Sequence, residues 1–525
     1  MQPSGGVACP SAGRRALQPR PWWSWLAPDV GLLVSCLTFA YCLFLFDGST
    51  RLFRDADSGW HIRVGEAIMA TGALPRTDPF SFTRPGQAWF AWEWGADVLM
   101  GLAHRAAGLP GVAWLYLLAI AAGVWLWFRL HWALGGNFWI ACAMAAPMLS
   151  TTNLHWLARP HLLSWVLILL AVWYAETAGE RFRPADAACI LAGSALWANL
   201  HASFFFAPAM ALMYAAAHWA RPLIWELDRA AEWRRARWFL SAAALAALGS
   251  LANPYGWELH RHVYRYLTDS ELLTRIGEFQ SFNFHVEGAF QILLTVALAG
   301  LGAVLALGQK RLGRFLLSAA LVAMALRSAR ALPLVALALL PLASASITEA
   351  LGKVATAGLR PALRKQLGAF LAYSERLRAI DARLNGAALA PALALLALAW
   401  MTTPAVAAKA GFPPDQFPVA AARELEKLPE DIRLLSPDKY GGYLIYRFAG
   451  KRKVFFDGRS DFYGAEFMKQ YARLVQLRPG WRRRLEELGF THALLPNNYP
   501  LVEALEHLGW KRLYGDGVCT LLRRP

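Results

Sequence analysis

Blocks of apolar residues, each close to the length that crosses a lipid bilayer, dominate the sequence. Hydrophobic residues make up 57% of the 525 positions, and 24 residues are Trp. A soluble fold cannot bury this much apolar sequence, whereas a bilayer core of about 30 Å accepts helices of about 20 apolar residues. The pattern predicts a polytopic α-helical membrane protein with about eleven transmembrane helices. The predicted spans are residues 28–47, 110–130, 137–152, 160–178, 186–200, 203–221, 237–252, 288–308, 313–327, 330–348 and 386–408.

Basic residues fall mainly in alternate loops between these blocks. The formal net charge is +17, which in a soluble chain would suggest a nucleic-acid partner. Here Lys and Arg gather in the tail 1–27 and in every second loop, as positive-inside bias predicts for cytoplasmic segments. We therefore expect membrane lipids and no nucleic acid as partners, a cytoplasmic N-terminus, and an external position for loop 48–109 and for everything after residue 408.

The last part of the chain has the pattern of a separate globular domain. A stretch rich in Pro and Ala over 404–418 ends the last apolar block, and short strand and helix patterns then alternate, which predicts a small α/β domain. The predicted organisation is a basic tail 1–27, a transmembrane unit 28–410 with a first external loop 48–109, and an external domain 411–525. In this domain we expect strands over 432–436, 453–456 and 491–495, a hairpin over 511–522, and helices over 418–428, 465–476, 481–488 and 501–508.

The first external loop carries a cluster of titratable residues directly after the first span. Asp55, Asp57, His61 and Arg63 lie within nine residues. A carboxylate at the mouth of a membrane cavity can act as a general base that removes a proton from an attacking acceptor group, and this role is assigned to Asp55 or Asp57. The alternative is that one of them caps the following helix. Glu93, later in the same loop, is a weaker candidate, with ion pairing to a nearby Arg as its alternative.

Polar residues also recur at the external ends of other spans. An Arg directly before a Pro that begins a helix, as in Arg159-Pro160, lies beside free backbone donors and suits a phosphate. A headgroup anchor would explain one such Arg. Polar residues lie at the external span ends in four segments in all, however, and ionisable groups at membrane depth usually share an interior site. The predicted substrate-binding residues are His155, Arg159, His161, Asn199, His201, Asn253, Tyr255, Arg327 and Arg330, with His61, Arg63 and Glu93 of the first loop.

A second acidic loop lies in the external domain. Asp457, Arg459 and Asp461 follow an apolar strand pattern. Such a loop can bind an acceptor or close over the membrane cavity, because binding groups favour loops on rigid scaffolds. The alternative is a tight turn in which Asp457 pairs with Arg459. Tyr440 and Tyr443 are expected to pack the domain against the membrane surface, where Tyr is favoured.

These motifs resemble a widespread group of bacterial integral-membrane proteins that is similar to the GT-C superfamily of glycosyltransferases. That superfamily includes protein O-mannosyltransferases and aminoarabinose transferases, and the resemblance covers nearly the whole chain. It implies a polyprenyl-phosphate-linked sugar as donor and a catalytic acidic residue in the first external loop, here Asp55 or Asp57. The matching motifs are Asp55-x-Asp57-x-x-Trp60-His61-x-Arg63-x-Gly65-Glu66, Pro75-Arg76-Thr77-Asp78-Pro79-Phe80-Ser81, Trp92-Glu93-Trp94, Arg159-Pro160-His161, Asn199-x-His201, Asn253-Pro254-Tyr255-Gly256 and Phe456-Asp457-Gly458-Arg459-x-Asp461.

One departure from the superfamily concerns a metal. Many of its members resemble one another in a second acidic residue, in the external loop after the third span, that is often associated with a divalent metal. Here that loop offers Asn153, His155, Arg159 and His161 instead. No metal ligands are therefore predicted, and a requirement for a divalent metal stays open. Without a metal, the charge of a leaving phosphate would have to be met by cationic side chains such as Arg159, Arg327 and Arg330.

The residues and the resemblance together predict an inverting membrane glycosyltransferase. It would move a sugar from a polyprenyl-phosphate carrier to an acceptor outside the bacterial cytoplasmic membrane, with the α/β domain in the periplasm. The sequence has no P-loop, GxGxxG, CxxC or HExxH motif, so nucleotide, redox and zinc-protease chemistry lack support. Two alternatives stay open, a lipid-carrier transporter and a non-catalytic scaffold of an envelope-polysaccharide system. The sugar, and whether the acceptor is a glycan, a lipid or a protein, are not specified.

Overall fold

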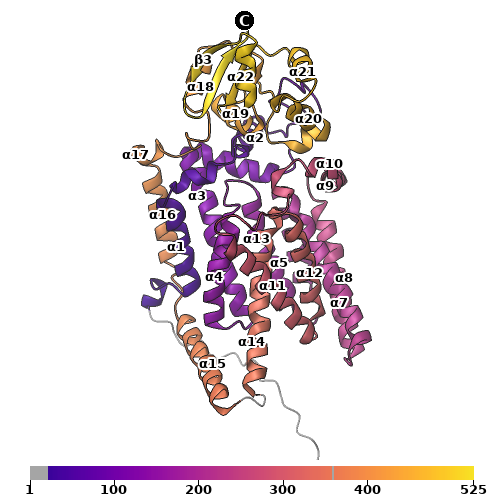
Figure 1. Ribbon diagram of the computed structural model, residues 1–525. Helices are drawn as coiled ribbons and strands as arrows, with labels where there is room; N and C mark the ends of the chain where they lie inside the picture. Colours follow the sequence, from indigo (N-terminus) through magenta and orange to yellow (C-terminus); the bar gives the residue numbers. More distant parts are fainter. Residues whose placement is uncertain (1–21, 357–359) are drawn as a thin grey trace, which may run out of the picture.

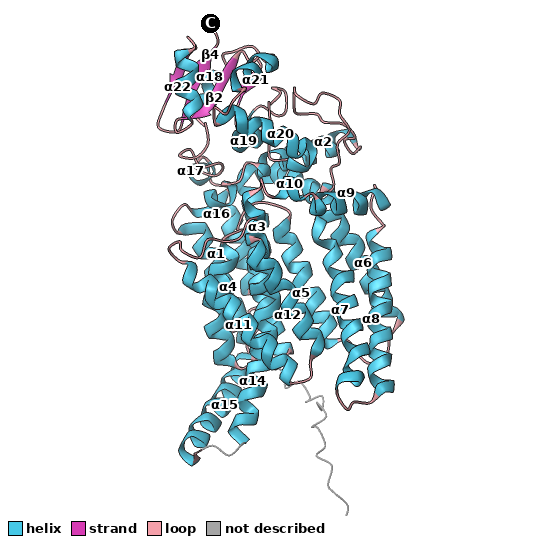
Figure 2. Cartoon of the chain, turned by 45° about the vertical axis from the view of Figure 1, so that its right-hand side comes forward, coloured by secondary structure: helices cyan, strands magenta, loops and turns pink. Residues whose placement is uncertain are grey.

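A bundle of long helices carries a small domain on one end (Figures 1 and 2). The computed structural model describes residues 22–356 and 360–525. A helix lies in each of the eleven predicted apolar blocks. The bundle helices are α1 (Val30–Phe44), α3 (Trp94–Ala133), α4 (Phe138–Asn153), α5 (His161–Thr177), α6 (Pro184–Leu200), α7 (Phe206–Ile224), α8 (Arg229–Ser250), α11 (Ala289–Gly308), α12 (Leu312–Arg327), α14 (Leu340–Thr356) and α16 (Leu389–Met401).

Not all of these helices have the length of a membrane span. Within the described residues, three helical stretches are long and apolar enough to cross a bilayer by length and composition, namely Trp94–Ala133, Ala289–Gly308 and Ala329–Thr356. Three shorter apolar helices are α1, α5 and α16. The helical and membrane character of the chain therefore agrees with the prediction, while the number of about eleven spans stays a prediction.

The remaining segments of the bundle are short or lie at its ends. The basic helix α15 (Pro361–Asp381) lies at the end opposite the small domain in Figure 1. That these two ends lie on two sides of a membrane stays a prediction. The tail 1–21 lies outside the described residues. The short elements are η1 (Trp22–Trp25), η2 (Gly48–Phe53), η3 (Ala202–Phe205), α9 (Trp257–Thr268), α10 (Ser270–Leu273), η4 (Gly277–Phe279), η5 (Ala329–Ala331), α13 (Leu332–Leu334), the π-helical η6 (Val335–Leu339) and α17 (Pro404–Ala407).

The first external loop folds into helix α2 (Asp57–Thr71) and an arm that returns to α3. Helix α2 packs closely against α3 at Gly65, where an added Cβ would lie 1.8 Å from the backbone O of Asp97. Helix α3 itself is broken at Ala107 and Gly108, where Gly108 takes a φ of 65° that favours glycine. The break separates the part of α3 that packs on α2 from the part that enters the bundle.

The small domain has a four-stranded sheet in the order β1-β2-β4-β3. The pair β1 and β2 is parallel, and the pairs β2 with β4 and β3 with β4 are antiparallel. Helices flank the sheet, so the predicted α/β class is correct. The elements are α18 (Ala421–Leu425), β1 (Leu434–Leu435), α19 (Asp438–Arg447), α20 (Ser460–Val475), α21 (Trp481–Leu488), β2 (His492–Pro496), α22 (Pro500–His507), β3 (Lys511–Gly515) and β4 (Cys519–Arg523).

Two local predictions for this domain are wrong. Residues 453–456 do not join the sheet; Val454 instead forms a single bridge with Ser81, because its backbone N–H and O are bonded to Phe80 and Phe82 in the arm of the first external loop. Tyr440 and Tyr443 do not face a membrane. They lie on helix α19, both are buried, and α19 packs against α2. The small domain is therefore joined to the first external loop by direct packing.

Candidate functional site

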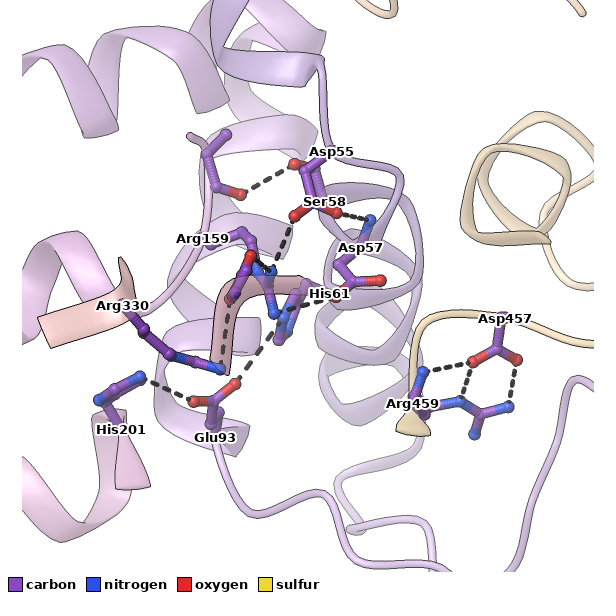
Figure 3. A network of polar contacts seen from close by, with 12 residues as sticks. Asp55, Asp57, Ser58, His61, Glu93, Arg159, His201, Arg330, Asp457 and Arg459 are labelled. Atoms are coloured by element: carbon purple, nitrogen blue, oxygen red, sulfur yellow. Dashed lines mark hydrogen bonds and ion pairs between the residues drawn. The ribbon is translucent and has the colours of Figure 1, made fainter. Parts of the chain in front are cut away.

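The guanidinium of Arg159 lies at the centre of a cluster of carboxylates from distant parts of the chain (Figure 3). Its Nη1 lies 2.8 Å from Asp55 Oδ2, and its Nη2 lies 2.9 Å from Asp57 Oδ2. Nη1 also lies 3.3 Å from Glu278 Oε1. The side chains of Asp55 and Asp57 are 21% and 9% exposed. The first external loop, the loop before α5 and the loop before α11 therefore meet at one point.

Local hydrogen bonds explain why the first loop presents its carboxylates here. The backbone N–H of Asp57 donates to Asp55 Oδ1 at 2.9 Å, so Asp55 holds the first turn of α2 while its other oxygen contacts Arg159. The Ser58 hydroxyl donates to the backbone O of Ala158 at 2.9 Å. This bond fixes the residue before Arg159 against α2.

The surroundings shift the acidity of the deeper carboxylate. Burial raises the pKa of Asp57, and the nearby charge of Asp55 raises it further, while Arg159 acts in the opposite direction. The pKa of Asp57 is thereby raised to about 8, and a carboxyl group with a raised pKa is a stronger base than an exposed one when it is deprotonated. The small domain touches it directly: a Cβ built on Gly458 would lie 1.9 Å from Asp57 Oδ1.

A second acidic centre lies beside the first. Glu93 precedes α3, and its Oε1 lies 3.4 Å from Nε2 of His201, while its Oε2 lies 3.8 Å from Nε2 of His61. His61 is fully buried, and its Nδ1 lies 2.5 Å from Oδ1 of Asp97. Burial raises the pKa of Glu93 to about 7, against the opposing charge of Arg159. Glu93 therefore titrates near neutral pH.

The sequence-based prediction did not include Glu278. This residue lies in η4, and its two oxygens bridge Arg159 and Arg330, the second at 3.4 Å from Arg330 Nη1. Burial raises its pKa, but the two arginines dominate and lower the pKa to about 2. Its only signal in the sequence is its place in the long external loop between α8 and α11. Many residues share that signal, so the pairing could not be foreseen.

Two cavities meet at this cluster. The first holds about 380 Å³, lies between the first loop and the small domain, and is lined by both carboxylates of the first loop and by Arg159. The second holds about 800 Å³ and runs along α5, α9, α12 and α13. It combines a polar end with an apolar wall. Its polar residues include His155, His161, His201, Arg327 and Arg330, and its apolar residues include Trp165, Ile168, Phe205 and Leu334. Both cavities are lined by Trp92, Tyr266, Glu278 and Arg330.

Several predicted site residues line neither cavity. Arg63 points to helix α19: its Nε and Nη2 donate to the backbone O of Tyr446 at 2.9 and 2.6 Å, and its Nη1 contacts Glu66 at 2.5 Å. Its guanidinium carbon also lies 4.7 Å from the centre of the Tyr446 ring. In this structure Arg63 therefore joins α2 to the small domain.

The amide and phenol residues of the predicted set hold loops together. Asn199 accepts a hydrogen bond from the Trp94 indole at 2.7 Å. Asn253 accepts one from the backbone N–H of Tyr255 at 2.8 Å, which shapes the turn before α9. The Tyr255 hydroxyl accepts from the backbone N–H of Ala91 at 3.2 Å. These contacts position the arm that carries Glu93.

The acidic loop of the small domain forms a closed ion network. Arg459 is fully buried, and its Nη2 lies 2.7 Å from Asp457 and 2.8 Å from Asp78 of the first external loop. Asp461 lies 3.0 Å from Nε2 of His262 on α9. Arg459 and Asp461 line the smaller cavity, so the loop both covers the site and ties it to the first external loop.

The donor set does not fit a divalent metal. The described residues contain no group of three or more His, Cys, Asp or Glu side chains placed to hold an ion. Asp55 and Asp57 both contact the guanidinium of Arg159, which supplies the positive charge between them. Their oxygens are thus bound to the guanidinium of Arg159, which Mg²⁺ or Mn²⁺ would have to displace in order to bind there.

Known structures of similar fold were found, although no protein-family model and no curated protein sequence matches the chain. The archaeal oligosaccharyltransferase AglB from Archaeoglobus fulgidus, solved with an inhibitory peptide and a dolichol-phosphate, is 12% identical, with a TM-score of 0.54 over 90% of this chain and 69% of that chain. The apo oligosaccharyltransferase of the same organism is 11% identical over 89% and 69%, with a TM-score of 0.49. ArnT from Cupriavidus metallidurans, bound to undecaprenyl phosphate, is 14% identical over 94% and 97%, with a TM-score of 0.47.

The AglB likeness extends over most of both chains. At 12% identity, this likeness shows a similarity of fold alone. The resemblance to the GT-C superfamily that the motifs predicted is thus confirmed at the level of the fold.

Proposed function

We propose that this protein is a membrane glycosyltransferase that transfers a sugar from a polyprenyl-phosphate carrier to an acceptor outside the bacterial cytoplasmic membrane. One observation carries the proposal. Arg159 joins the carboxylates of the first external loop to a second guanidinium through Glu278, at the point where two cavities meet. One cavity has the chemistry of a lipid-phosphate site, and the other has a buried base.

The larger cavity fits the donor. A polyprenyl phosphate needs a cationic end for its phosphate and an apolar wall for its chain, and this cavity offers Arg327, Arg330 and three histidines beside an apolar wall. The AglB structure of similar fold was solved with a dolichol-phosphate, which is a lipid of this class. We place the donor phosphate next to Arg330 and Arg159, with the lipid chain along α5 and α12.

The smaller cavity fits the acceptor and the base. An acceptor hydroxyl attacks the anomeric carbon of the sugar, the bond from that carbon to the phosphate oxygen breaks, and the hydroxyl proton passes to Asp57. The released phosphate keeps the bonding electrons, and Arg159 and Arg330 balance its charge. A single displacement of this kind inverts the anomeric configuration. We assign Asp57 as the base and Asp55 as the residue that orients Arg159 and begins α2.

The test is transfer by the purified full chain in vesicles, with a panel of undecaprenyl-phosphate-linked hexoses and pentoses and a periplasmic extract as acceptor. Asp57→Asn should reduce the transfer rate by about 100-fold or more, because it removes the base. The control is Asp415→Asn, which changes an exposed carboxylate in the linker before the small domain. Transfer at an unchanged rate in the Asp57→Asn protein would contradict the assignment of the base.

A transporter is the second candidate, and one observation favours it. A buried ion pair lies between Glu176 and Arg314, at 2.6 Å, with the Tyr214 hydroxyl donating to the same carboxylate at 2.5 Å. A transporter needs polar groups at the opposite end of the bundle as well as at its external end, and Glu176 and Arg314 lie in terminal turns of α5 and α12 at that opposite end. Because these three side chains bond to one another and join α5, α7 and α12, they also suit helix packing. Movement of a fluorescent undecaprenyl phosphate across the same vesicles, without sugar transfer, would support the transporter.

A further inference from the structure

A third cavity lies on the small domain, outside the cluster described above. It holds about 540 Å³ and opens between the arm of the first external loop and helices α20 and α21. Its lining includes three arginines and three aromatic residues: Arg84, Arg433, Arg484, Phe82, Tyr463 and Phe467. Arg84 belongs to the first loop, whereas Arg433 and Arg484 belong to the small domain, so only the docking of this domain on the first loop brings all three together.

Two of these arginines are held in place by hydrogen bonds to backbone oxygens of the small domain. Arg84 Nη2 donates to the backbone O of Tyr463 at 3.1 Å. Arg433 Nε donates to the backbone O of Leu488 at 3.0 Å, and its guanidinium carbon lies 4.8 Å from the centre of the Phe82 ring. Arg84 Nη1 also donates to Gln87 Oε1 at 3.0 Å, so Arg84 uses two of its nitrogens and Arg433 uses one, and the remaining N–H groups are left for a ligand.

Arg484 adds a third positive charge. Its Nη1 lies 3.2 Å from Glu487, but its Nε is buried and makes no hydrogen bond within the described residues. Because this Nε has no exposed surface, Arg484 offers a ligand in the cavity its positive charge rather than that donor. The single carboxylate in the lining is Glu466, which is exposed.

The basic surroundings strengthen the preference for an anion. The stretch from Ser460 to Leu488 contains six Lys and Arg against four Asp and Glu. Helix α21 lies on the side of the small domain away from the helix bundle, as Figures 1 and 2 both show. A lipid headgroup in the bilayer therefore does not reach this cavity, and the ligand must come from the space outside.

The third cavity and the catalytic cluster share helix α20. Ser460 and Asp461 line the smaller catalytic cavity, whereas residues from Tyr463 to Gln470 line the third cavity. The two sets come within two residues of each other in the sequence, at Asp461 and Tyr463, and α20 is broken at Gly464. A linear polymer can therefore occupy the third cavity and extend along α20 to the catalytic cavity, and aromatic rings such as Phe82 and Phe467 can face its apolar surfaces.

We infer that the third cavity binds the acceptor, and that this acceptor is an anionic saccharide chain with carboxylate groups. The guanidinium groups pair with the carboxylates, and the aromatic rings contact the sugar rings. This inference rests on the proposed transfer reaction for its meaning, since the chain would be held with its growing end near Asp57. The binding step itself needs neither the donor nor the base.

The test is calorimetric titration of the full chain in detergent with trigalacturonate, without donor. Trigalacturonate should bind, and neutral maltotriose and inorganic phosphate should bind at least tenfold more weakly. Arg433→Gln and Arg484→Gln should each weaken trigalacturonate binding at least tenfold. Arg483→Gln is the matched control, because Arg483 is 85% exposed on the same helix and does not line the cavity.

Each outcome decides between the two proposals. The inference would be overturned if trigalacturonate does not bind, or if maltotriose or phosphate binds as tightly as trigalacturonate. It would also be overturned if the Arg483→Gln protein loses as much binding as the Arg433→Gln and Arg484→Gln proteins. If binding is present but no donor supports transfer, the proposed function fails and the glycan site stands; if transfer occurs without this binding, the reverse holds.

Discussion

At the scale of single residues, the two aspartates of the first loop occupy different surroundings. One oxygen of Asp55 accepts a hydrogen bond in the first turn of α2, and the other contacts Arg159. Asp57 lies deeper, and its side chain is next to Gly458. The charge of Asp55 contributes to the raised pKa of Asp57. The base must be deprotonated to act, so we expect transfer to fall on acidification at a higher pH than an ordinary carboxylate would give.

This difference predicts the behaviour of the Asp55→Asn protein. Asn keeps an oxygen for the Asp57 N–H but removes a negative charge that raises the pKa of Asp57. The acid limb of the transfer rate should therefore move to lower pH, which a pH–rate profile measures in vesicles. The Asp415→Asn protein should keep the original limb. A limb that moves to higher pH, or stays in place, would show that Asp57 is not the group that titrates.

Glu278 holds the two cations that the donor phosphate needs. Its carboxylate bridges Arg159 and Arg330 and stays ionised because they lower its pKa to about 2. Glu278→Gln should therefore tighten binding of undecaprenyl phosphate by up to about tenfold, since a competing anion is removed. Binding to the detergent-solubilised protein measures this. Glu287→Gln, an exposed neighbour in the same loop, should have no effect, and weaker binding in the Glu278→Gln protein would contradict competition.

At the scale of secondary-structure elements, glycines set the distance between α2 and α19. A Cβ built on Gly442 would lie 2.2 Å from the backbone O of Ala56, and one on Gly59 would lie 2.1 Å from the backbone O of Gly442. The two helices therefore touch backbone to backbone. This contact supports the residues that begin α2, including the two aspartates.

Gly442→Ala should separate these helices. In an open helical position the change would favour the helix by about 1 kcal/mol, but here the new methyl group overlaps backbone and should cost about 1–3 kcal/mol. We expect a lower apparent unfolding temperature and reduced transfer. Gly368→Ala on α15, where a Cβ meets nothing within 4 Å, is the matched control and should not lower the unfolding temperature. Equal behaviour of both proteins would show that α2 and α19 do not need close contact.

At the scale of the whole molecule, one buried ion network joins the small domain to the membrane unit. Arg459 bonds Asp457 in its own domain and Asp78 in the first external loop, and all three side chains are buried. Removing one partner from such a network leaves uncompensated charge. The small domain is therefore held over the site by electrostatics as well as by packing.

Arg459→Gln should loosen this attachment. The loss of the buried cation should cost about 3–5 kcal/mol and expose the linker over 404–418 to protease. Limited proteolysis of the purified protein measures the rate of cleavage in that linker. Arg447→Gln changes an arginine that pairs at the surface with Glu426, and cleavage should stay slow. If the Arg459→Gln protein is as resistant as the parent, the small domain is held mainly by packing between α2 and α19.

The sequence determined the parts of this protein that depend on short-range patterns. Apolar blocks predicted where helices form, because each block must bury its own length of backbone and side chains. Alternating patterns predicted the class of the small domain, and the motif residues predicted a resemblance that the fold confirms. The strand expected over 453–456 is wrong because a strand needs partner strands in the sheet, and Val454 instead bridges Ser81, which comes from a distant part of the chain.

Tertiary structure alone decided which of the polar residues meet. Arg159 and Asp57 were both foreseen, but their contact at 2.9 Å and the bridge through Glu278 depend on three loops closing on one another. Arg63 carries the same charge as Arg159, yet it faces helix α19. Side chains separated by hundreds of residues gain free energy from pairing only after the helices have packed. The sequence therefore specified the groups present at the external end, and the packing specified which of them form the site.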